Sequence, residues 1–150
     1  MTKMRESAMK PIEWKEYEEA VRLLTALAQT DTSGGRAAAQ VVLSAYNGDE
    51  WQLDVTELSL LDGKYYLAAL NVIRGRKELM IEPHSLIRDG RQIFHRIWNQ
   101  WRRYHISNRW KQTCFTCNGR GKIVDYDDND REVVSPCGKC GGEGLIAQAT

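Results

Sequence analysis

The four cysteines of this chain lie in two copies of one eight-residue pattern, C-x-x-C-x-G-x-G. Nineteen residues separate the two C-x-x-C pairs, a spacing typical of a four-cysteine zinc site. Each C-x-x-C turn lets two sulfurs reach one ion, and the glycines permit positive φ angles where the chain folds back around it. We therefore expect one structural zinc ion, with no open position for a catalytic water, held by Cys114, Cys117, Cys137 and Cys140.

The repeated C-x-x-C-x-G-x-G pattern resembles the cysteine-rich zinc domain of the DnaJ (Hsp40) co-chaperones, which carries four such repeats and two zinc sites. Here two repeats occur, within residues 112–146, and the chain has neither a His-Pro-Asp tripeptide nor a Gly/Phe-rich linker, so a full co-chaperone is excluded. The resemblance implies that the four cysteines bind one zinc ion and that the segment between them forms a β-hairpin. It leaves the activity open, because single-site relatives are protein-docking elements, nucleic-acid-associated knuckles or structural staples.

Composition indicates one main domain with a small appendage. The chain has 150 residues, of which 42% are hydrophobic and 27% are charged, as is ordinary for a globular protein. No apolar run is long enough to span a bilayer, and residues 1–10 lack the apolar segment of a secretory signal. We therefore expect a cytoplasmic protein with no membrane partner, and reduced thiols favour zinc over two disulfides. The net charge of +1 gives no global attraction to nucleic acid.

The region before the cysteines predicts a mainly α fold, with about four helices in a compact domain over residues 11–108. A flexible segment at residues 1–10 is expected before it and a tail at residues 147–150 after the zinc module of residues 112–146. Pro11 suits the first position of a helix that runs to about Ala28, because proline lacks the N–H that would have no partner there. Residues expected to face the core from this helix are Trp14, Tyr17, Ala20, Val21, Leu24, Leu27 and Ala28.

Three further helices are expected. The second runs from Arg36 to Tyr46, after a turn rich in capping side chains. The third begins after Asp54, with Glu57 completing a reciprocal capping arrangement, and continues past an interruption at Asp62-Gly63 to Gly75. The last covers residues 91–106. Apolar residues that continue the pattern of the third helix are Tyr65, Tyr66, Leu67, Leu70, Val72 and Ile73; those that form a stripe on the last are Ile93, Phe94, Ile97, Trp98, Trp101 and Tyr104.

The helical region also resembles an uncharacterised helical domain family of bacterial plasmid and phage proteins. The matching stretches are residues 53–58, Leu61-Asp62 and the late helix ending in Trp101-Arg102. This resemblance covers about residues 15–105 and implies an accessory gene product of a mobile element, and it transfers no catalytic residue. Accessory proteins of this kind are often inhibitors or regulators of host machinery, such as a defence system.

Residues 88–111 are strongly basic, with seven arginines and lysines, one aspartate and a local net charge of +6. One interpretation is an amphipathic helix whose basic face is only solvated. The other is a face that binds phosphate or carboxylate groups through arginine forks, with aromatic side chains stacking beside them. Candidate residues for binding a nucleic acid or an acidic partner are Arg91, Arg96, Arg102, Arg103, Arg109, Lys111 and Trp110.

The segment between the two cysteine repeats is acidic, with a net charge of −4 over residues 125–132, and this charge disfavours a phosphate backbone. We expect it to be a solvated hairpin tip flanked by strand residues Ile123 and Val124 on one side and Val133 and Val134 on the other. It is not a calcium loop, because Asp130 stands where that loop needs glycine. Opposite charges in two regions suit docking on a protein or ribonucleoprotein, since complementary fields steer encounter.

No sequence pattern indicates an enzyme. The three histidines, His84, His95 and His105, show no informative spacing to a serine or cysteine nucleophile, and no phosphate-binding or dinucleotide fingerprint occurs. We therefore expect a non-enzymatic, zinc-containing adaptor or inhibitor that docks on a protein or ribonucleoprotein, with no small-molecule substrate. The alternatives are a nucleic-acid-binding protein that uses residues 88–111, and chaperone-like or thiol-disulfide activity of the C-x-x-C pairs.

Overall fold

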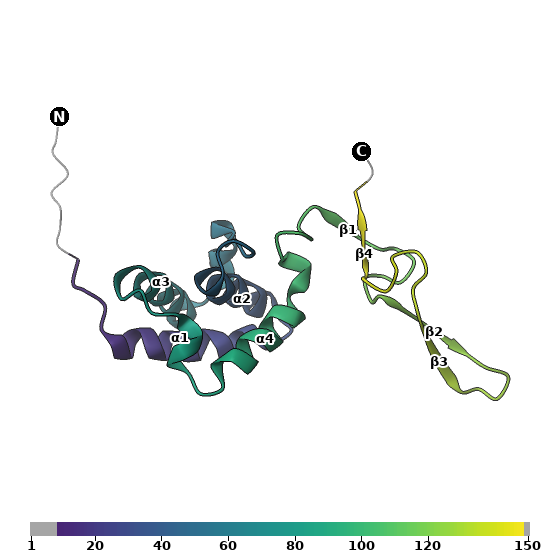
Figure 1. Cartoon of the computed structure of the whole chain (residues 1–150), viewed down its shortest axis with the longest axis horizontal. Helices are drawn as coiled ribbons and strands as arrows, with labels where there is room; N and C mark the ends of the chain where they lie inside the picture. The colour runs from purple at the N-terminus through teal and green to yellow at the C-terminus, as the bar shows by residue number, and fades with distance from the viewer. Residues whose placement is uncertain (1–8, 149–150) are drawn as a thin grey trace. The chain divides into compact units, whose positions relative to one another are not determined.

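The computed structural model describes residues 9–148, and the chain divides between Arg102 and Arg103 into a helical unit and a cysteine unit (Figure 1). The helical unit contains four α-helices, and the cysteine unit contains four short strands. This arrangement confirms the expected fold class of a mainly helical protein with a small C-terminal β module. Residues 1–8 of the expected N-terminal segment and residues 149–150 of the expected tail lie outside the described residues.

Helix α1 (Trp14–Ala28) begins three residues later than predicted, because Glu13 rather than Pro11 marks its start. The backbone N–H of Glu13 donates to Oε1 of Glu16 at 3.1 Å, which gives an otherwise unpaired donor at the helix start a partner. The predicted stripe is buried through Tyr17, Val21 and Leu24. Trp14 is an exception, since it lies in the first turn with half of its surface exposed.

Helix α2 (Ser33–Tyr46) lies at the centre of the helical unit. It begins three residues before the predicted Arg36, because the Thr32 hydroxyl accepts the backbone N–H of Gly35 at 2.9 Å. Its middle turns are buried on nearly every side, with three consecutive alanines followed, after Gln40, by two valines and a leucine. The buried residues of these turns are Ala37, Ala38, Ala39, Gln40, Val41, Val42 and Leu43.

The third predicted helix is two elements, the 3₁₀-helix η1 (Val55–Leu60) and α3 (Gly63–Glu78). The reciprocal cap predicted for Asp54 and Glu57 is wrong. The Asp54 side chain does cap η1 through the N–H of Thr56, but Glu57 forms a bidentate ion pair with Arg36 at 2.8 and 3.0 Å. The backbone N–H of Asp54 donates to Gln40 instead. Glu57 therefore ties η1 to α2 rather than closing its own helix.

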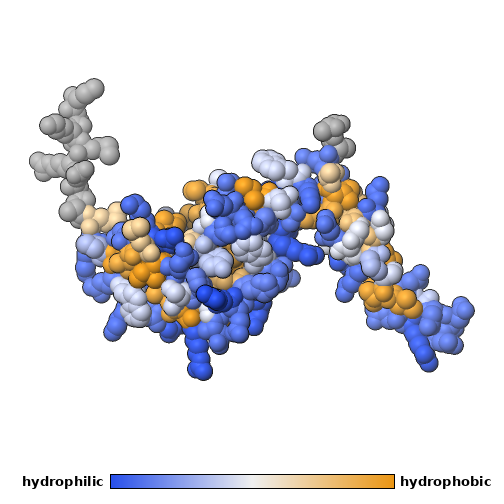
Figure 2. All heavy atoms as spheres, viewed as in Figure 1, coloured by the Kyte–Doolittle hydropathy of each residue, from blue (hydrophilic) through white to orange (hydrophobic). Residues whose placement is uncertain are grey.

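Helix α3 buries small side chains and exposes large ones. The buried positions are Ala68, Ala69, Val72 and Gly75, and the ring of Tyr17 lies directly against Gly75. Most of the large apolar residues predicted to continue the core pattern are exposed, namely Tyr66, Leu67, Leu70 and Ile73. Figure 2 shows hydrophobic surface over this part of the molecule. Small residues allow the backbones of α1 and α3 to approach closely, and this contact excludes the larger side chains.

The last helix, α4 (Gly90–Gln100), follows the 3₁₀-helix η2 (Pro83–Leu86) and ends earlier than the predicted residue 106. Trp101 leaves helical geometry where its indole N–H donates to the carbonyl of Ala28 at 2.6 Å. A short 3₁₀ turn, η3 (Arg102–Tyr104), comes next. Phe94 and Ile97 are fully buried, as the predicted stripe requires. Among residues 9–148, no helix combines the length and apolar character needed to cross a membrane.

The cysteine unit consists of two antiparallel pairs of strands. Strands β2 (Lys122–Tyr126) and β3 (Glu132–Pro136) form the predicted hairpin, in which Val124 lies opposite Val134. Strands β1 (Lys111–Thr113) and β4 (Leu145–Ala147) lie at the two ends of the unit's sequence and pair with each other. This strand pair was not predicted. The two cysteine repeats lie between these pairs, one in the loop from β1 to β2 and one in the loop from β3 to β4.

Candidate metal centre

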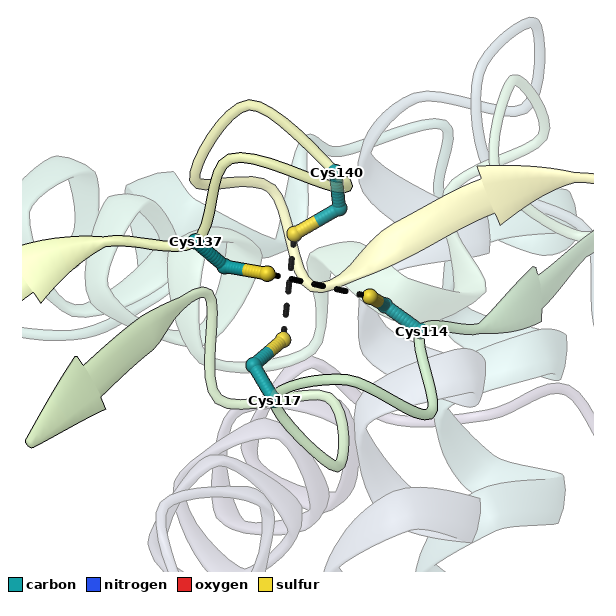
Figure 3. A group of neighbouring side chains, drawn as sticks. All are labelled: Cys114, Cys117, Cys137 and Cys140. Atoms are coloured by element: carbon teal, nitrogen blue, oxygen red, sulfur yellow. Dashed lines mark hydrogen bonds between the residues drawn. The ribbon is translucent and has the colours of Figure 1, made fainter.

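The four cysteine sulfurs converge on one point (Figure 3). All four Sγ atoms lie within 4.8 Å of one another, with 3.9 Å between Cys114 and Cys137 and 3.7 Å between Cys117 and Cys140. These separations exceed the S–S bond of about 2.05 Å, so the cysteines are not disulfide-bonded. Thiolates placed about 2.3 Å from a tetrahedral ion lie roughly 3.8 Å apart, which these separations match. The cluster therefore fits a metal site.

The two repeats have the same backbone conformation and exchange hydrogen bonds. The N–H of Cys114 donates to the carbonyl of Gly144, and the N–H of Cys137 donates to the carbonyl of Gly121, both at 2.9 Å. Within each repeat the second residue after the C-x-x-C pair bonds back to the first cysteine: Gly119 to Cys114 at 3.0 Å and Gly142 to Cys137 at 3.1 Å. The repeats are thus related by an approximate two-fold axis, and each completes the backbone bonding of the other.

The last glycine of each repeat has no room for a side chain. Gly121 has φ +76°, and a Cβ there would lie 2.4 Å from the carbonyl oxygen of Gly142. Gly144 has φ +78°, and its Cβ would lie 2.4 Å from the carbonyl oxygen of Gly119. Both the left-handed backbone and the close approach exclude other residues. These contacts are the physical reason for the fixed glycine at the end of C-x-x-C-x-G-x-G.

Backbone N–H groups also point at the sulfurs. Gly121 donates to Sγ of Cys117 at 3.2 Å, and Gly144 donates to Sγ of Cys140 at 3.1 Å. Burial opposes ionisation of Cys140, but hydrogen bonds from the backbone of Gly144 and Gly142 outweigh it and lower the pKa of this thiol to about 7. The backbone N–H of Cys117 lowers the pKa of Cys114. The site therefore favours the thiolate form that a metal requires at two of its ligands.

Most of the cysteine ligands are shielded from solvent, and apolar side chains from strands β2 and β4 pack against them. Cys114 and Cys137 are fully buried, Cys117 is 5% exposed, and the half-buried side chains of Ile123 and Ile146 pack against them. Burial raises the pKa of Cys117, so a bound cation would also remove the cost of enclosing its charge. With all four sulfurs directed at one point, an ion bound here has its four tetrahedral positions filled. The arrangement can stabilise a fold.

The basic candidate residues do not lie on one helix. Arg91 and Arg96 lie exposed on α4, where Nη1 of Arg96 donates to Oε1 of Gln29 at 2.9 Å. Arg102 is exposed in η3. Lys111 begins β1 and lies 3.7 Å from a carboxylate oxygen of Glu143.

Two of the predicted binding arginines donate hydrogen bonds to carbonyls of nearby residues in the chain. Arg103 donates to the carbonyls of Asn108 and Lys111 at 2.8 and 2.9 Å, and Arg109 donates to the carbonyl of Tyr104 at 3.1 Å. Both therefore brace the turn that leads into β1. Trp110, in the same turn, is 78% exposed. Its exposure leaves it accessible to a ligand of the cysteine unit.

A cleft in the helical unit brings together residues that showed no relation in the sequence. It has a volume of about 840 Å³, and its walls include Arg91, both His84 and His95, and the aromatic rings of Tyr46 and Trp98. The His84 ring contacts Tyr46 edge-on, with 5.1 Å between centroids. These side chains come from α2, η2 and α4, so only the folded arrangement relates them, and no local sequence spacing signals the cleft.

Comparison with known proteins matches the helical unit to a protein family, and the matched region ends before the first cysteine. No curated protein and no solved structure matches the chain significantly. The match is to a family described as a family of unknown function (DUF7673), and it spans residues 18–102. It therefore covers the four α-helices from the first turns of α1 onward, and it assigns no role to any residue. Because the matched residues make up more than half of the chain, this protein belongs to that family of unknown function.

Proposed function

We propose that this protein is a small, non-enzymatic, zinc-containing adaptor or inhibitor that docks on a protein or ribonucleoprotein in the cytoplasm. The observation that carries this proposal is the form of the cysteine unit. Its four sulfurs enclose one metal position, and that position anchors a hairpin whose strand β3 is exposed at all five residues. A metal site whose four positions are all filled by protein ligands stabilises structure and does not perform chemistry. An exposed hairpin offers a surface that another molecule can contact.

Zinc is the ion best suited to this site. Four thiolates in a tetrahedron select zinc or iron among the common metals, and zinc needs no redox partner. Elemental analysis of the purified protein should give one zinc per chain. Replacing it with cobalt should give the visible absorption of a tetrahedral thiolate complex, and a Cys137→Ser variant should lose that absorption. Iron in place of zinc, or less than half an equivalent of any metal, would contradict the assignment.

Docking on a protein can be tested by affinity capture of the tagged, zinc-loaded protein from a bacterial lysate, with and without nuclease. A protein partner recovered in stoichiometric amount after nuclease treatment supports the adaptor or inhibitor. Loss of all capture on nuclease treatment overturns protein docking. The resemblance of the helical region to plasmid and phage accessory proteins supports a host protein, such as a component of a defence system, as the target.

Nucleic-acid binding is the second candidate, and it is favoured by the surface exposure of three basic residues, Arg91, Arg96 and Arg102. Arginine forks bind phosphate bidentately, and such binding weakens steeply as salt rises. An Arg91→Glu/Arg96→Glu variant should then lose the mobility shift of generic DNA or RNA. Arg22→Glu, which changes an exposed arginine on α1, is the matched control. No shift by the unmodified protein at low salt would rule this function out.

A further inference from the structure

We propose that one face of the β2–β3 hairpin binds a segment of a partner protein that carries lysines or arginines beside apolar side chains. We call this surface the hairpin face and define it by Val124, Tyr126 and Val134. The inference rests on the proposed docking function and names the docking surface and the chemistry of its partner. The evidence for it is an uncovered apolar surface on the hairpin and the negative charge of the residues beside that surface.

The pairing register places these three residues on one side of the hairpin. Directly opposed residues of an antiparallel pair point to the same side, and so do residues two apart along a strand. Val124 lies opposite Val134, and Tyr126, two residues on, lies opposite Glu132. Val124 is 38% exposed, Val134 is 53% exposed and Tyr126 is 66% exposed. Three neighbouring apolar side chains therefore face solvent together.

The opposite side of the hairpin differs at its base. Ile123, on that side, packs against the buried cysteines and so belongs to the small core of the metal centre. Among residues 103–148, nothing covers the hairpin face in this way, and both of its valines remain accessible. A two-stranded hairpin ordinarily places polar side chains on its solvated side, because it has no second layer to cover apolar ones. The apolar side chains of the hairpin face indicate a surface that a partner covers.

The charge beside the hairpin face specifies the partner. Residues 125–132 carry five carboxylates and one arginine. Asp127 is used internally, since its Oδ1 accepts the backbone N–H groups of Asn129 and Arg131, both at 2.9 Å. Within the described residues, the carboxylates of Asp128, Asp130 and Glu132 take part in no hydrogen bond or ion pair. A partner segment with lysines or arginines would supply their counter-charges, whereas an acidic segment or a nucleic acid would be repelled.

The metal centre holds the hairpin in place before any partner arrives. Lys122, the first residue of β2, follows Gly121, and Cys137 follows the last residue of β3. The N–H of Cys137 donates to the carbonyl of Gly121 at 2.9 Å, so the open end of the hairpin is fixed at the ligands. A surface held in its bound conformation loses less entropy on binding. Partner binding should therefore depend on the metal.

The test uses the full, zinc-loaded chain with a photo-reactive amino acid at position 126 in place of Tyr126. After nuclease treatment of the lysate, irradiation should cross-link a partner peptide with an excess of lysine and arginine. A Val124→Thr/Val134→Thr variant should reduce capture of that partner about tenfold, because threonine keeps the shape and strand preference of valine without its apolar surface. An Asp128→Lys/Asp130→Lys variant should reduce it by a similar factor.

Val133→Thr is the matched control, because Val133 is 46% exposed on the opposite side of the same strand. It should leave capture unchanged. If all three variants capture the partner as well as the unmodified protein, docking occurs elsewhere; the proposed function then stands and this inference fails. If the unmodified protein captures no protein, both fail. Cross-links to acidic peptides or to nucleic acid would also overturn the inference. If the Val124→Thr/Val134→Thr variant loses its metal, the Asp128→Lys/Asp130→Lys variant still tests the inference.

Discussion

Gly144, like Gly121, is a residue at which a single added methyl group should disturb the metal centre. Alanine there would need φ +78° and would place its Cβ 2.4 Å from a backbone oxygen, so both backbone strain and a steric clash oppose it. We expect Gly144→Ala to weaken metal binding at least tenfold, equivalent to about 1.4 kcal/mol. Competition with a chromophoric chelator measures this change.

Gly138 provides the control, since an added Cβ would meet nothing within 4 Å and its φ is not positive. Gly138→Ala should bind the metal with the affinity of the unmodified protein. Equal affinities for the two variants would contradict the role given to Gly144.

Tyr17 should make the helical unit sensitive to alkali. Burial raises the pKa of Tyr17 to about 12, against an opposing effect of nearby Arg76, and its hydroxyl donates to the carbonyl of Ile81 at 2.7 Å. In the unfolded chain the tyrosine pKa is about 10. The folded state therefore binds this proton more tightly, and the stabilisation is complete below pH 10 and is lost as the pH rises from about 10 to about 12.

Denaturant unfolding at a series of pH values checks this expectation. The free energy of unfolding should fall more steeply above pH 10 for the unmodified protein than for Tyr17→Phe. At neutral pH the variant should be less stable by about 1 kcal/mol, because the carbonyl of Ile81 loses its hydrogen bond. Parallel pH profiles for the two proteins would show that another group controls alkaline unfolding.

At the scale of elements, the packing of α3 on α1 depends on a glycine. A Cβ on Gly75 would lie 2.1 Å from Cγ of Tyr17, inside the ring contact between the two helices. Overpacking of this kind costs about 1–3 kcal/mol, so Gly75→Ala should lower the midpoint of thermal unfolding markedly. Gly63→Ala, at the start of the same helix, meets nothing within 4 Å and should be neutral or slightly stabilising. Equal midpoints for both variants would contradict close packing at Gly75.

The elements with long regular patterns were predictable, and the short ones were not. Helices α1 and α4 follow from apolar spacing, and α2 follows from the capping turn before it. The hairpin strands follow from the apolar pairs Ile123-Val124 and Val133-Val134 on either side of a polar turn. Strands β1 and β4 have three residues each and pair across more than thirty intervening residues, so neither shows an alternation that a local pattern can detect. For α3 the apolar pattern indicated a helix correctly but indicated the wrong face. Large side chains dominate such a pattern, whereas close packing here selected Ala68, Ala69 and Gly75.

Of the candidate sites, the cysteine cluster was predictable from the sequence, and the arrangement of the basic residues was not. Four cysteines at fixed spacing predicted their own cluster, because the repeat determines the local geometry. The net charge of residues 88–111 did not predict the hydrogen bonds of their arginines. Arg103 and Arg109 donate to carbonyls five or eight residues away in the chain. Composition alone cannot distinguish such internal hydrogen bonds from bonds to a ligand. Glu57, which was predicted to cap its own helix, similarly forms an ion pair with Arg36 that joins η1 to α2.

At the scale of the whole molecule, removing the metal should affect the two units differently. The helical unit buries its own core of aliphatic and aromatic side chains, while the buried hydrophobic residues of the cysteine unit centre on the metal ligands themselves. Metal binding energy is therefore folding energy for the cysteine unit. Chelator should abolish amide protection in residues 111–147 and leave the helical circular dichroism signal largely intact. Loss of the helical signal at the same chelator concentration would contradict this expectation.

The bond from the N–H of Cys137 to the carbonyl of Gly121 closes the hairpin at its base, independently of its tip. In polymer terms the tip is a loop whose ends are already held, and doubling the length of such a loop costs only about 0.6 kcal/mol. Residues 127–131 can accordingly be lengthened, shortened or replaced while the chemistry of the metal is untouched. The cysteine unit can thus serve as a frame for an interchangeable tip, whose sequence can change separately from the residues that hold the unit together.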